Sequence, residues 1–135
     1  YAVIKDLLKT TVYRLSELRN GRRNAQAGMP VIPQRILTRA PTAELRFDQT
    51  DQDSLPPYDV LDDILRRFVE RGESVAEIAS AGHSQAVIEQ VMGLLRRSEY
   101  KRRQAAPGAR ITPRAFGRDW RFPLTNCFSE KELFS

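Results

Sequence analysis

Three neighbouring segments in the middle of the chain constrain the fold most strongly, because each places apolar residues at helical spacing. The first covers residues 57–71, the second 74–81 and the third 85–97. Gly72 and Gly82 follow the first two segments, and glycine suits the left-handed position after a helix. The pattern predicts three consecutive helices with defined ends.

The starts of these helices also have clear signals. Pro57 suits the first position of a helix, because its fixed φ is already helical. Ser74 and Glu77 have the spacing of a capping box, and Ser84 is placed to cap the third helix. The apolar stripes of the first and third helices are Val60, Leu61, Ile64, Leu65 and Phe68, and Val87, Ile88, Val91, Met92 and Leu95.

The region before them is also predicted to be mainly helical. Residues 1–4 are apolar and are expected to end a buried segment, whereas 33–39 are expected to form a short helix. A longer helix is predicted over about 7–19, and its buried face would consist of Leu8, Val12, Leu15 and Leu18. The expected fold class of the 135-residue chain is therefore mainly α, with long ordered loops, in one domain.

Residues 38–55 have almost no apolar periodicity but carry several threonines, acids and arginines. A structureless connection of this length inside a compact domain is usually either functional or disordered. Leu45, Phe47 and Leu55 are spaced through the segment, which favours an ordered loop. We interpret 38–55 as an active-site loop that becomes ordered over a ligand.

The net charge of +5 is concentrated near the C-terminal end of the chain. Residues 96–121 contain nine Lys or Arg and two acids, Glu99 and Asp119. Cations at this density attract phosphate, whether on a nucleotide or on a nucleic acid. The mixture of arginines and aromatics over 114–121 suits a nucleotide, a nucleic acid or a subunit contact. Four aromatic residues are expected to attach this tail to the body: Phe116, Trp120, Phe122 and Phe128.

Several classes of protein are disfavoured by the composition. The single Cys127 cannot form an internal disulfide, and one cysteine with one histidine is too few for a zinc site. His83 precedes a capping serine and is expected to be an exposed residue without a chemical role. No apolar run reaches the ~18 residues of a membrane span. A cytoplasmic location without a membrane partner is expected.

Three separate stretches of the chain resemble the synthetase domain of NAD synthetases, especially the glutamine-dependent bacterial form. They are residues 2–13 (AVIKDLLKTTVY), 39–62 (RAPTAELRFDQTDQDSLPPYDVLD) and 99–123 (EYKRRQAAPGARITPRAFGRDWRFP). The resemblance implies that residues 1–135 are the C-terminal portion of such a domain, on the flank of a Rossmann-like α/β fold. The nucleotide-binding half and an amidase domain would then lie upstream.

The resemblance also implies a ligase activity, the ATP-dependent amidation of deamido-NAD to NAD with ammonia from glutamine. ATP and Mg²⁺ would be required, with the Mg²⁺ ligands outside this segment. Glu44 and Asp48 are oxygen donors, but they are as readily explained as loop acids paired with Arg46. The expected partners are deamido-NAD, ATP, ammonia or glutamine and further copies of the chain, without nucleic acid. The family's Gly-Gly phosphate loop is absent from these residues, so the chain alone is expected to be inactive.

Four site residues follow from the resemblance. Lys9 and Thr42 match positions that contact ATP, whereas Tyr100 and Lys101 match a pair that contacts deamido-NAD. From the residues alone, Lys9 could bind phosphate or be solvated, and Thr42 could simply form a turn. Lys101, expected at the end of the third long helix, could simply complement a helix C-terminus. No catalytic residue and no metal ligand is assigned.

The main alternative is a nucleic-acid-binding module of the helix-turn-helix kind. The helices predicted over 57–71, 74–81 and 85–97 have suitable lengths, and the basic stretch follows directly. Against this, the second helix is acidic to neutral and the third exposes few cations. A purely structural helical domain is a third option, but it leaves the loop over 38–55 without an explanation.

Overall fold

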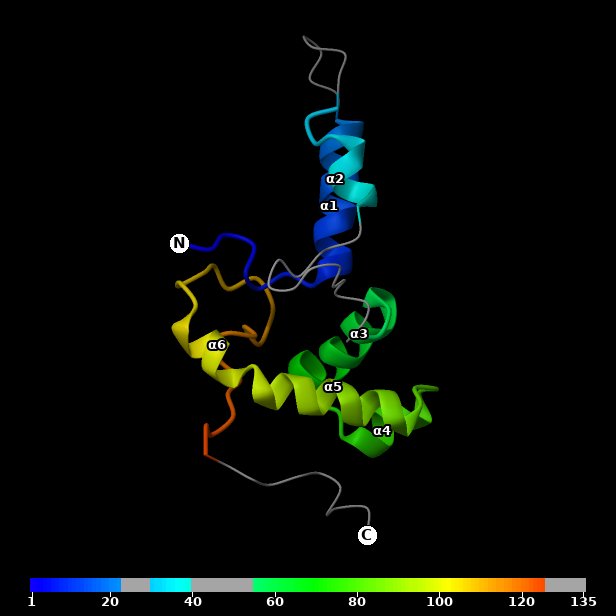
Figure 1. Ribbon diagram of the computed structural model, residues 1–135, viewed down its shortest axis with the longest axis vertical. Helices are drawn as coiled ribbons and strands as arrows, with labels where there is room; N and C mark the ends of the chain where they lie inside the picture. The colour runs from blue at the N-terminus through cyan, green and yellow to red at the C-terminus, as the bar shows by residue number, and fades with distance from the viewer. Residues whose placement is uncertain (23–29, 40–54, 126–135) are drawn as a thin grey trace, which may run out of the picture.

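The computed structural model describes residues 1–22, 30–39 and 55–125, and these are mainly helical (Figure 1). Within these residues there is no strand, only one isolated parallel bridge between Ala2 and Gly108. The prediction of a mainly α chain is confirmed. The elements are α1 (Lys9–Gly21), α2 (Gln34–Thr38), α3 (Tyr58–Leu65), the π-helical segment η2 (Arg66–Arg71), α4 (Val75–Ser80), α5 (Gln85–Arg97) and α6 (Glu99–Gln104).

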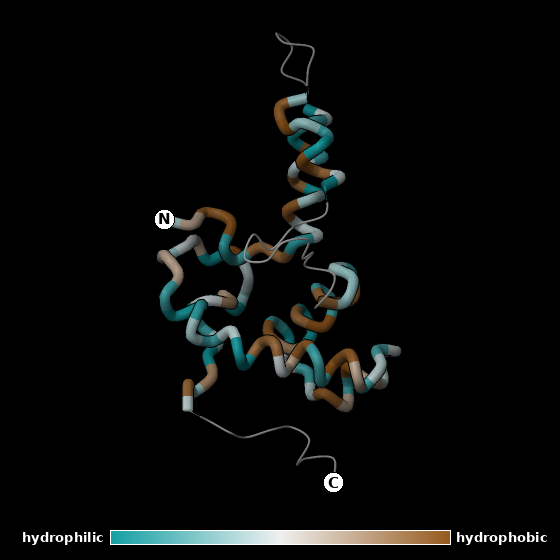
Figure 2. The backbone as a smooth tube through the Cα atoms, in the orientation of Figure 1, coloured by the Kyte–Doolittle hydropathy of each residue, from teal (hydrophilic) through white to brown (hydrophobic). Residues whose placement is uncertain are grey.

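The core lies where α3, η2, α4 and α5 pack against one another, and we call these four elements the helical body. Figure 2 shows the hydrophobic stretches of these helices where they meet. Ile64, Ile78 and Ile88 have no exposed surface at all. The other buried members of the cluster are Val69, Val75, Val91, Met92 and Leu95. The predicted stripe of α5 is therefore confirmed as its buried side.

The predicted helix signals of the helical body are present. The Ser74 hydroxyl accepts the Glu77 N–H at 3.3 Å, and the Glu77 carboxylate accepts the Ser74 N–H at 2.7 Å, which is a complete capping box. The Ser84 hydroxyl accepts the N–H three residues further on at 3.4 Å. Gly72 and Gly82 have φ of 71° and 103°, values that side chains with a Cβ rarely adopt.

One detail of the first predicted body helix is wrong. Residues 57–71 were expected to form one α-helix, but its last six residues are π-helical. The Arg67 carbonyl accepts the N–H of Gly72, five residues on, and also that of Glu73 at 3.0 Å. The wider turn leaves Val69 in the core, with 2% of its surface exposed.

The helices α1 and α2 form an arm that projects from the body (Figure 1). The side chain of Asn20 joins α1 to the segment just before α2, because its amide pairs with both the N–H and the carbonyl of Ile32 at 2.8 Å. The prediction that α1 buries an apolar face is wrong within the described residues. Leu15 and Leu18 are about half exposed and no residue of α1 is buried, because only the lower part of the arm reaches α3.

The N-terminal segment runs beside the loop that follows α6, and we call residues 2–6 and 105–122 the terminal junction (Figure 1). The Ala2 N–H donates to the Pro107 carbonyl at 2.9 Å. Residues 1–4 were expected to be buried, but Tyr1, Val3 and Ile4 are all more than half exposed. This expectation was wrong because the segment attaches through its backbone and polar side chains.

The aromatic residues of the tail pack as expected. Phe116, Trp120 and Phe122 contact the core cluster. The ring of Trp120 lies edge-on to Phe68 of η2 at 5.2 Å and to Phe122 at 4.4 Å between centroids. Phe128 lies outside the described residues. In the part of the chain that the structure describes, no helix is long and apolar enough to cross a membrane.

Candidate functional site

The short helix α6 carries the pair Tyr100 and Lys101. Lys101 was expected at the end of the third long helix, but that helix ends at Arg97 and Lys101 belongs to a separate helix. Both side chains are exposed, and the Lys101 ammonium lies 5.9 Å from the centroid of the Tyr100 ring. Lys101 makes no ion pair with any residue that the structure describes. The pair is therefore available to a negatively charged ligand with a planar group.

A buried carboxylate fixes α6 to the tail. Glu99 is 1% exposed and forms an ion pair with Arg102. It also accepts from Arg103 Nε at 3.2 Å and from the Phe122 N–H at 3.2 Å. Burial would raise the pKa of Glu99, but the Arg102 hydrogen bond and the Phe122 N–H outweigh it and hold that pKa below its usual value. Glu99 therefore stays charged and anchors the helix that presents Lys101.

Arg102 is buried, whereas the neighbouring Lys101 is exposed. Its guanidinium lies 4.8 Å from the ring centroid of Phe116 and 5.7 Å from that of Trp120. Only 7% of its surface is exposed. The basic stretch was expected to form one phosphate-attracting face, but Arg102 and Glu99 instead form a buried ion pair within it. Glu99, the acid among the five cations of 96–103, was the signal that could have indicated this.

Lys9 is the first residue of α1 and is exposed. Its ammonium lies 5.6 Å from the ring centroid of Tyr13 and 5.8 Å from that of Tyr58. The next residue donates its backbone N–H to the buried carboxylate of Asp62 at 2.7 Å. An acid from α3 therefore occupies part of the helix terminus, while the Lys9 ammonium remains on the surface beside two tyrosines.

Some of the site residues predicted from the sequence lie outside the part of the chain that the structure describes. Thr42, Glu44 and Asp48 lie outside the described residues, as does nearly all of the loop over 38–55. Lys9 and Lys101 occupy separate places in the described structure, the first at the base of the arm and the second on α6 (Figure 1). Among the described residues, no group of three or more His, Cys, Asp or Glu side chains could hold a metal ion.

Asp6 is a structural residue that sequence reasoning missed. Its Oδ2 accepts the N–H groups of Ile111 and Thr112 at 2.8 and 2.7 Å and the Thr112 hydroxyl at 2.8 Å. Its Oδ1 accepts the Phe116 N–H at 2.9 Å. Burial would raise the pKa of Asp6, but the N–H groups, Thr112 first, outweigh it and lower that pKa. No local pattern indicates such contacts, because the partners lie 105 to 110 positions away.

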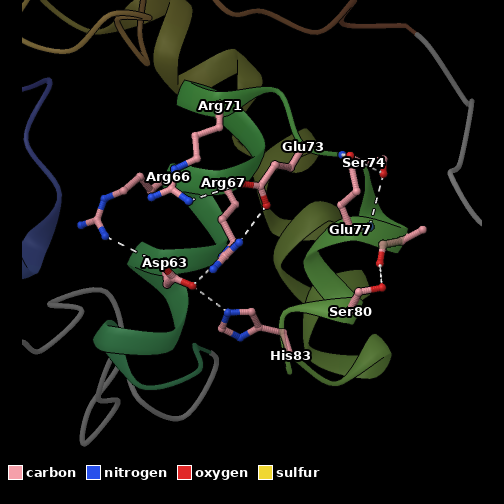
Figure 3. Close-up of polar contacts among 10 residues, drawn as sticks. Asp63, Arg66, Arg67, Arg71, Glu73, Ser74, Glu77, Ser80 and His83 are labelled. Atoms are coloured by element: carbon pink, nitrogen blue, oxygen red, sulfur yellow. Dashed lines mark hydrogen bonds and ion pairs between the residues drawn. The ribbon is translucent and has the colours of Figure 1, made fainter.

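His83 also has a different place from the one expected. Its Nε2 lies 2.9 Å from Asp63 Oδ2, and its side chain is 16% exposed (Figure 3). Arg67 contacts the same carboxylate at 2.9 Å and also reaches Glu73 at 3.0 Å. The Arg67 hydrogen bond, followed by that of His83, lowers the pKa of Asp63. The prediction of an exposed histidine was wrong, because Asp63 of α3 faces the loop before α5.

The geometry does not favour the helix-turn-helix alternative. The helix α4 has six residues, and the exposed side of α5 carries Gln85, Ala86 and Gln90 before its only exposed cation, Arg97. A recognition helix needs side chains along one face that reach base edges or phosphates. Neither helix offers such a basic face in the described residues.

Comparison with known proteins agrees with the resemblance seen in the sequence. The family model described as NAD synthase matches residues 1–105. Over 129 residues the chain is 51% identical to the glutamine-dependent NAD(+) synthetase of Xanthomonas campestris pv. campestris, covering 96% of this chain and 23% of that protein. Over 130 residues it is 51% identical to the enzyme of the same name from Thermotoga maritima, covering 96% of this chain and 22% of that protein.

A solved structure gives the same result. The glutamine-dependent NAD+ synthetase from Acinetobacter baumannii, in complex with adenosine diphosphate, superposes with a TM-score of 0.51 at 43% identity. The match covers 90% of this chain and 20% of that one. The chain thus spans less than a quarter of the length of these relatives. From the family match and these identities we conclude that the chain belongs to the NAD synthase family.

Proposed function

We propose that this chain is the C-terminal part of the synthetase domain of a glutamine-dependent NAD synthetase, a ligase, and that it supplies part of its ATP and deamido-NAD sites. The proposal is supported by relatives of that name at 51% identity and by a similar structure solved with adenosine diphosphate. The whole enzyme would be a cytoplasmic homo-oligomer. Its nucleotide-binding half would have a Rossmann-like fold, and the present chain would lie on the flank of that fold.

The proposed reaction has two steps. An oxygen of the deamido-NAD carboxylate bonds to the α-phosphorus of ATP, the bond to the β-phosphate oxygen breaks, and pyrophosphate leaves. Ammonia released from glutamine then attacks the carbonyl carbon of the acyl-adenylate, and AMP leaves with the electron pair of the broken C–O bond. Both steps need cations near the phosphates and protection of the acyl-adenylate from water. Residues 38–55 would be the active-site loop that provides this protection.

The observation that carries the proposal is the exposure of Lys101 on a helix anchored by a buried carboxylate. Lys101, which makes no ion pair with any described residue and lies on a helix fixed by Glu99, can neutralise a negative group of deamido-NAD at a defined position. Tyr100 beside it can stack on a planar ring or donate a hydrogen bond. Lys9 and Thr42 would contact ATP, Lys9 through its exposed ammonium at the base of the arm.

Mg²⁺ would supply charge neutralisation for the phosphates of ATP. In the described part of the chain no set of acids is arranged to hold it. Following the family resemblance, we propose that its ligands lie outside this segment. The cations proposed here act directly on the substrates.

The test is Lys101→Ala in the full-length enzyme, with NAD formation measured from deamido-NAD, ATP and free ammonia. Loss of one charged contact, worth roughly 1.5–3 kcal/mol, should raise the apparent KM for deamido-NAD by about ten- to a hundredfold. Glutamine hydrolysis should be unchanged, because ammonia is produced elsewhere. Arg97→Ala is the matched control, since it removes an exposed cation four residues earlier, at the end of α5, and should leave the KM unchanged.

An unchanged KM for deamido-NAD in Lys101→Ala would overturn the residue assignment. An equal rise in Arg97→Ala would also count against it, because the effect would then reflect general surface charge.

A further inference from the structure

The start of α1 has no cap from side chains of its own segment. The helix begins with Lys9, and Leu8 before it is apolar and provides no side-chain hydrogen bond. No acid lies in the first turn of α1. The first backbone N–H groups of a helix have no partner within that helix. The start of α1 therefore depends on groups that come from elsewhere in the chain.

One such group is the carboxylate of Asp62 on α3, 52 positions away in the sequence. Its Oδ2 accepts the Thr10 N–H at 2.7 Å, the short distance of a charge-assisted hydrogen bond. Asp62 is only 3% exposed, so water has little access to this carboxylate. A negative charge at this end of a helix also complements the helix macrodipole. Asp62 thus acts as a helix cap that the helical body supplies to the arm.

The capped backbone is directly next to Lys9. The Lys9 side chain is exposed and makes no hydrogen bond or ion pair with any residue that the structure describes. Its ammonium has two aromatic neighbours, at 5.6 Å from the ring centroid of Tyr13 and 5.8 Å from that of Tyr58. Tyr58 and Asp62 are one turn apart on α3. The same helix therefore contacts both the side chain of Lys9 and the backbone that follows it.

The next acid of α3, Asp63, has different partners. It contacts Arg67 and His83, each at 2.9 Å, and these belong to the helical body (Figure 3). Two adjacent carboxylates of one helix thus hold different parts of the molecule. Asp62 holds the start of the arm, whereas Asp63 holds the body together.

We propose that Asp62 is a positioning residue for ATP binding, because it fixes the start of α1 and so determines where Lys9 presents its ammonium. This role rests on the proposed function, since it requires that Lys9 contact ATP. Asp62 itself does not touch ATP, because its carboxylate is buried and is bonded to the helix backbone. What matters is the place of its oxygen and not an effect of its charge on the ligand.

The experiment measures the KM for ATP of the full-length enzyme, with saturating deamido-NAD and free ammonia. Asp62→Asn removes the charge but keeps an oxygen that can accept the Thr10 N–H. Because asparagine caps helices as well as aspartate does, its KM for ATP should stay within about twofold of the unmodified enzyme. Asp62→Glu keeps the charge but moves the carboxylate by one methylene. Its KM should rise about fivefold, as expected when ATP binding must order a helix start that has lost its cap.

A double variant tests whether Asp62 acts through Lys9. Lys9→Met removes the ammonium and keeps an unbranched side chain, and it should raise the KM for ATP by about ten- to a hundredfold. Adding Asp62→Glu to Lys9→Met should raise it no further, because both changes remove the same contact. The KM for deamido-NAD should be unchanged in each single variant. A general structural defect would instead add to the effect of Lys9→Met and would change both KM values.

Asp63→Ala is the matched control, since it removes the adjacent acid together with its contacts in the body. Its KM for ATP should be unchanged. Far-UV circular dichroism of each variant shows whether the helices are retained. Where Asp62→Glu does not fold, Asp62→Ala replaces it with the same expected result, because it also removes the contact to Thr10.

The outcomes separate the role of Asp62 from that of Lys9. An unchanged KM for ATP in Lys9→Met would overturn the ATP contact of the proposed function, and the role of Asp62 with it. A raised KM in Lys9→Met, with no change in Asp62→Glu or with additive effects in the double variant, would overturn the role of Asp62 alone. So would an equal rise in Asp62→Asn and Asp62→Glu, or a rise in Asp63→Ala.

Discussion

The helical body and the terminal junction are held together in opposite ways. The body buries eight apolar side chains between neighbouring helices, and its one buried carboxylate among the described residues, Asp62, accepts the Thr10 N–H of the arm. The junction contributes buried Ala115 and the partly buried rings of Phe116, Trp120 and Phe122. It is fixed by two buried carboxylates, its own Asp6 and Glu99 of the adjoining helix α6. Apolar burial is non-directional, whereas each carboxylate must meet specific N–H groups at hydrogen-bond distance.

The helical body should therefore tolerate changes of apolar side chain, whereas the terminal junction depends on exact hydrogen-bond geometry. Contacts in the body connect elements close together in sequence, such as α4 with α5. Contacts in the junction connect residues more than one hundred positions apart, such as Asp6 and Ile111. The surface proposed for a ligand, around Lys101, is on the helix that one of these carboxylates, Glu99, fixes to the junction.

The largest effect is expected from a cavity in the body. Ile88→Ala removes a side chain with no exposed surface and should destabilise the body by about 2–5 kcal/mol. Hydrogen exchange of α5 amides in the full-length enzyme would measure this as faster local opening. Ile111→Ala is the matched control, since Ile111 lies in the junction and is 54% exposed. An equal effect of the two variants would contradict the contrast between the regions.

A smaller but more localised effect is expected from Asp6→Asn. An amide has one acceptor oxygen in place of two, and its NH₂ would face N–H donors, so about 1–3 kcal/mol of local stability should be lost. Exchange should accelerate over 108–118 while α5 remains protected. The exposed Asp59 provides the control, because Asp59→Asn changes the same charge without altering the junction. Faster exchange in α5 as well would show that the two regions unfold together.

Lowering the pH should also reduce the local stability of the terminal junction, by less than Asp6→Asn does. The pKa values of Asp6 and Glu99 are lowered in the folded chain, from ordinary values of 3.8 and 4.5. Their contribution to stability is therefore complete above those values and is lost as the pH falls through the lower, folded pKa values. Protonation leaves both oxygens as acceptors, so the loss should be smaller than in Asp6→Asn.

The measurement is the exchange rate over 108–118 between about pH 6 and pH 3, corrected for the intrinsic pH dependence of exchange. The junction should loosen below about pH 4.5, and Asp6→Asn should show a weaker pH dependence because one of the two titrating groups is gone. An acid response of the same size in that variant would assign the effect to other carboxylates, such as Asp63 in the helical body.

The helical body could be predicted well because its determinants are local. The capping box of Ser74, the cap of Ser84 and the left-handed glycines each act within four residues. Ile88 and Val91 lie on a stripe whose period alone assigns them to the core. The π-helical turn of η2 was not predictable, because the widened turn leaves the same apolar spacing almost unchanged.

Periodicity was less informative for α1, because no described residue packs over the outer part of its apolar stripe. Leu15 and Leu18 have the spacing of a buried face, yet they are about half exposed on the arm. A pattern states which side of a helix is apolar and does not state what lies against it. Asp6 left no periodic signal, because its partners come from a distant, irregular segment. Lys9 and Lys101 came from the family resemblance, and their roles stay predictions.

The connection between Asp6 and the loop over 111–116 also has a consequence for the order of folding. During synthesis Asp6 leaves the ribosome 105 residues before the first of these hydrogen-bond partners, Ile111. Until then the body can already form through contacts between consecutive helices, since nearby partners meet faster than distant ones. We therefore expect the junction to close last, so that a nascent or truncated chain would contain folded helices while the loop over 111–116 is still unassembled.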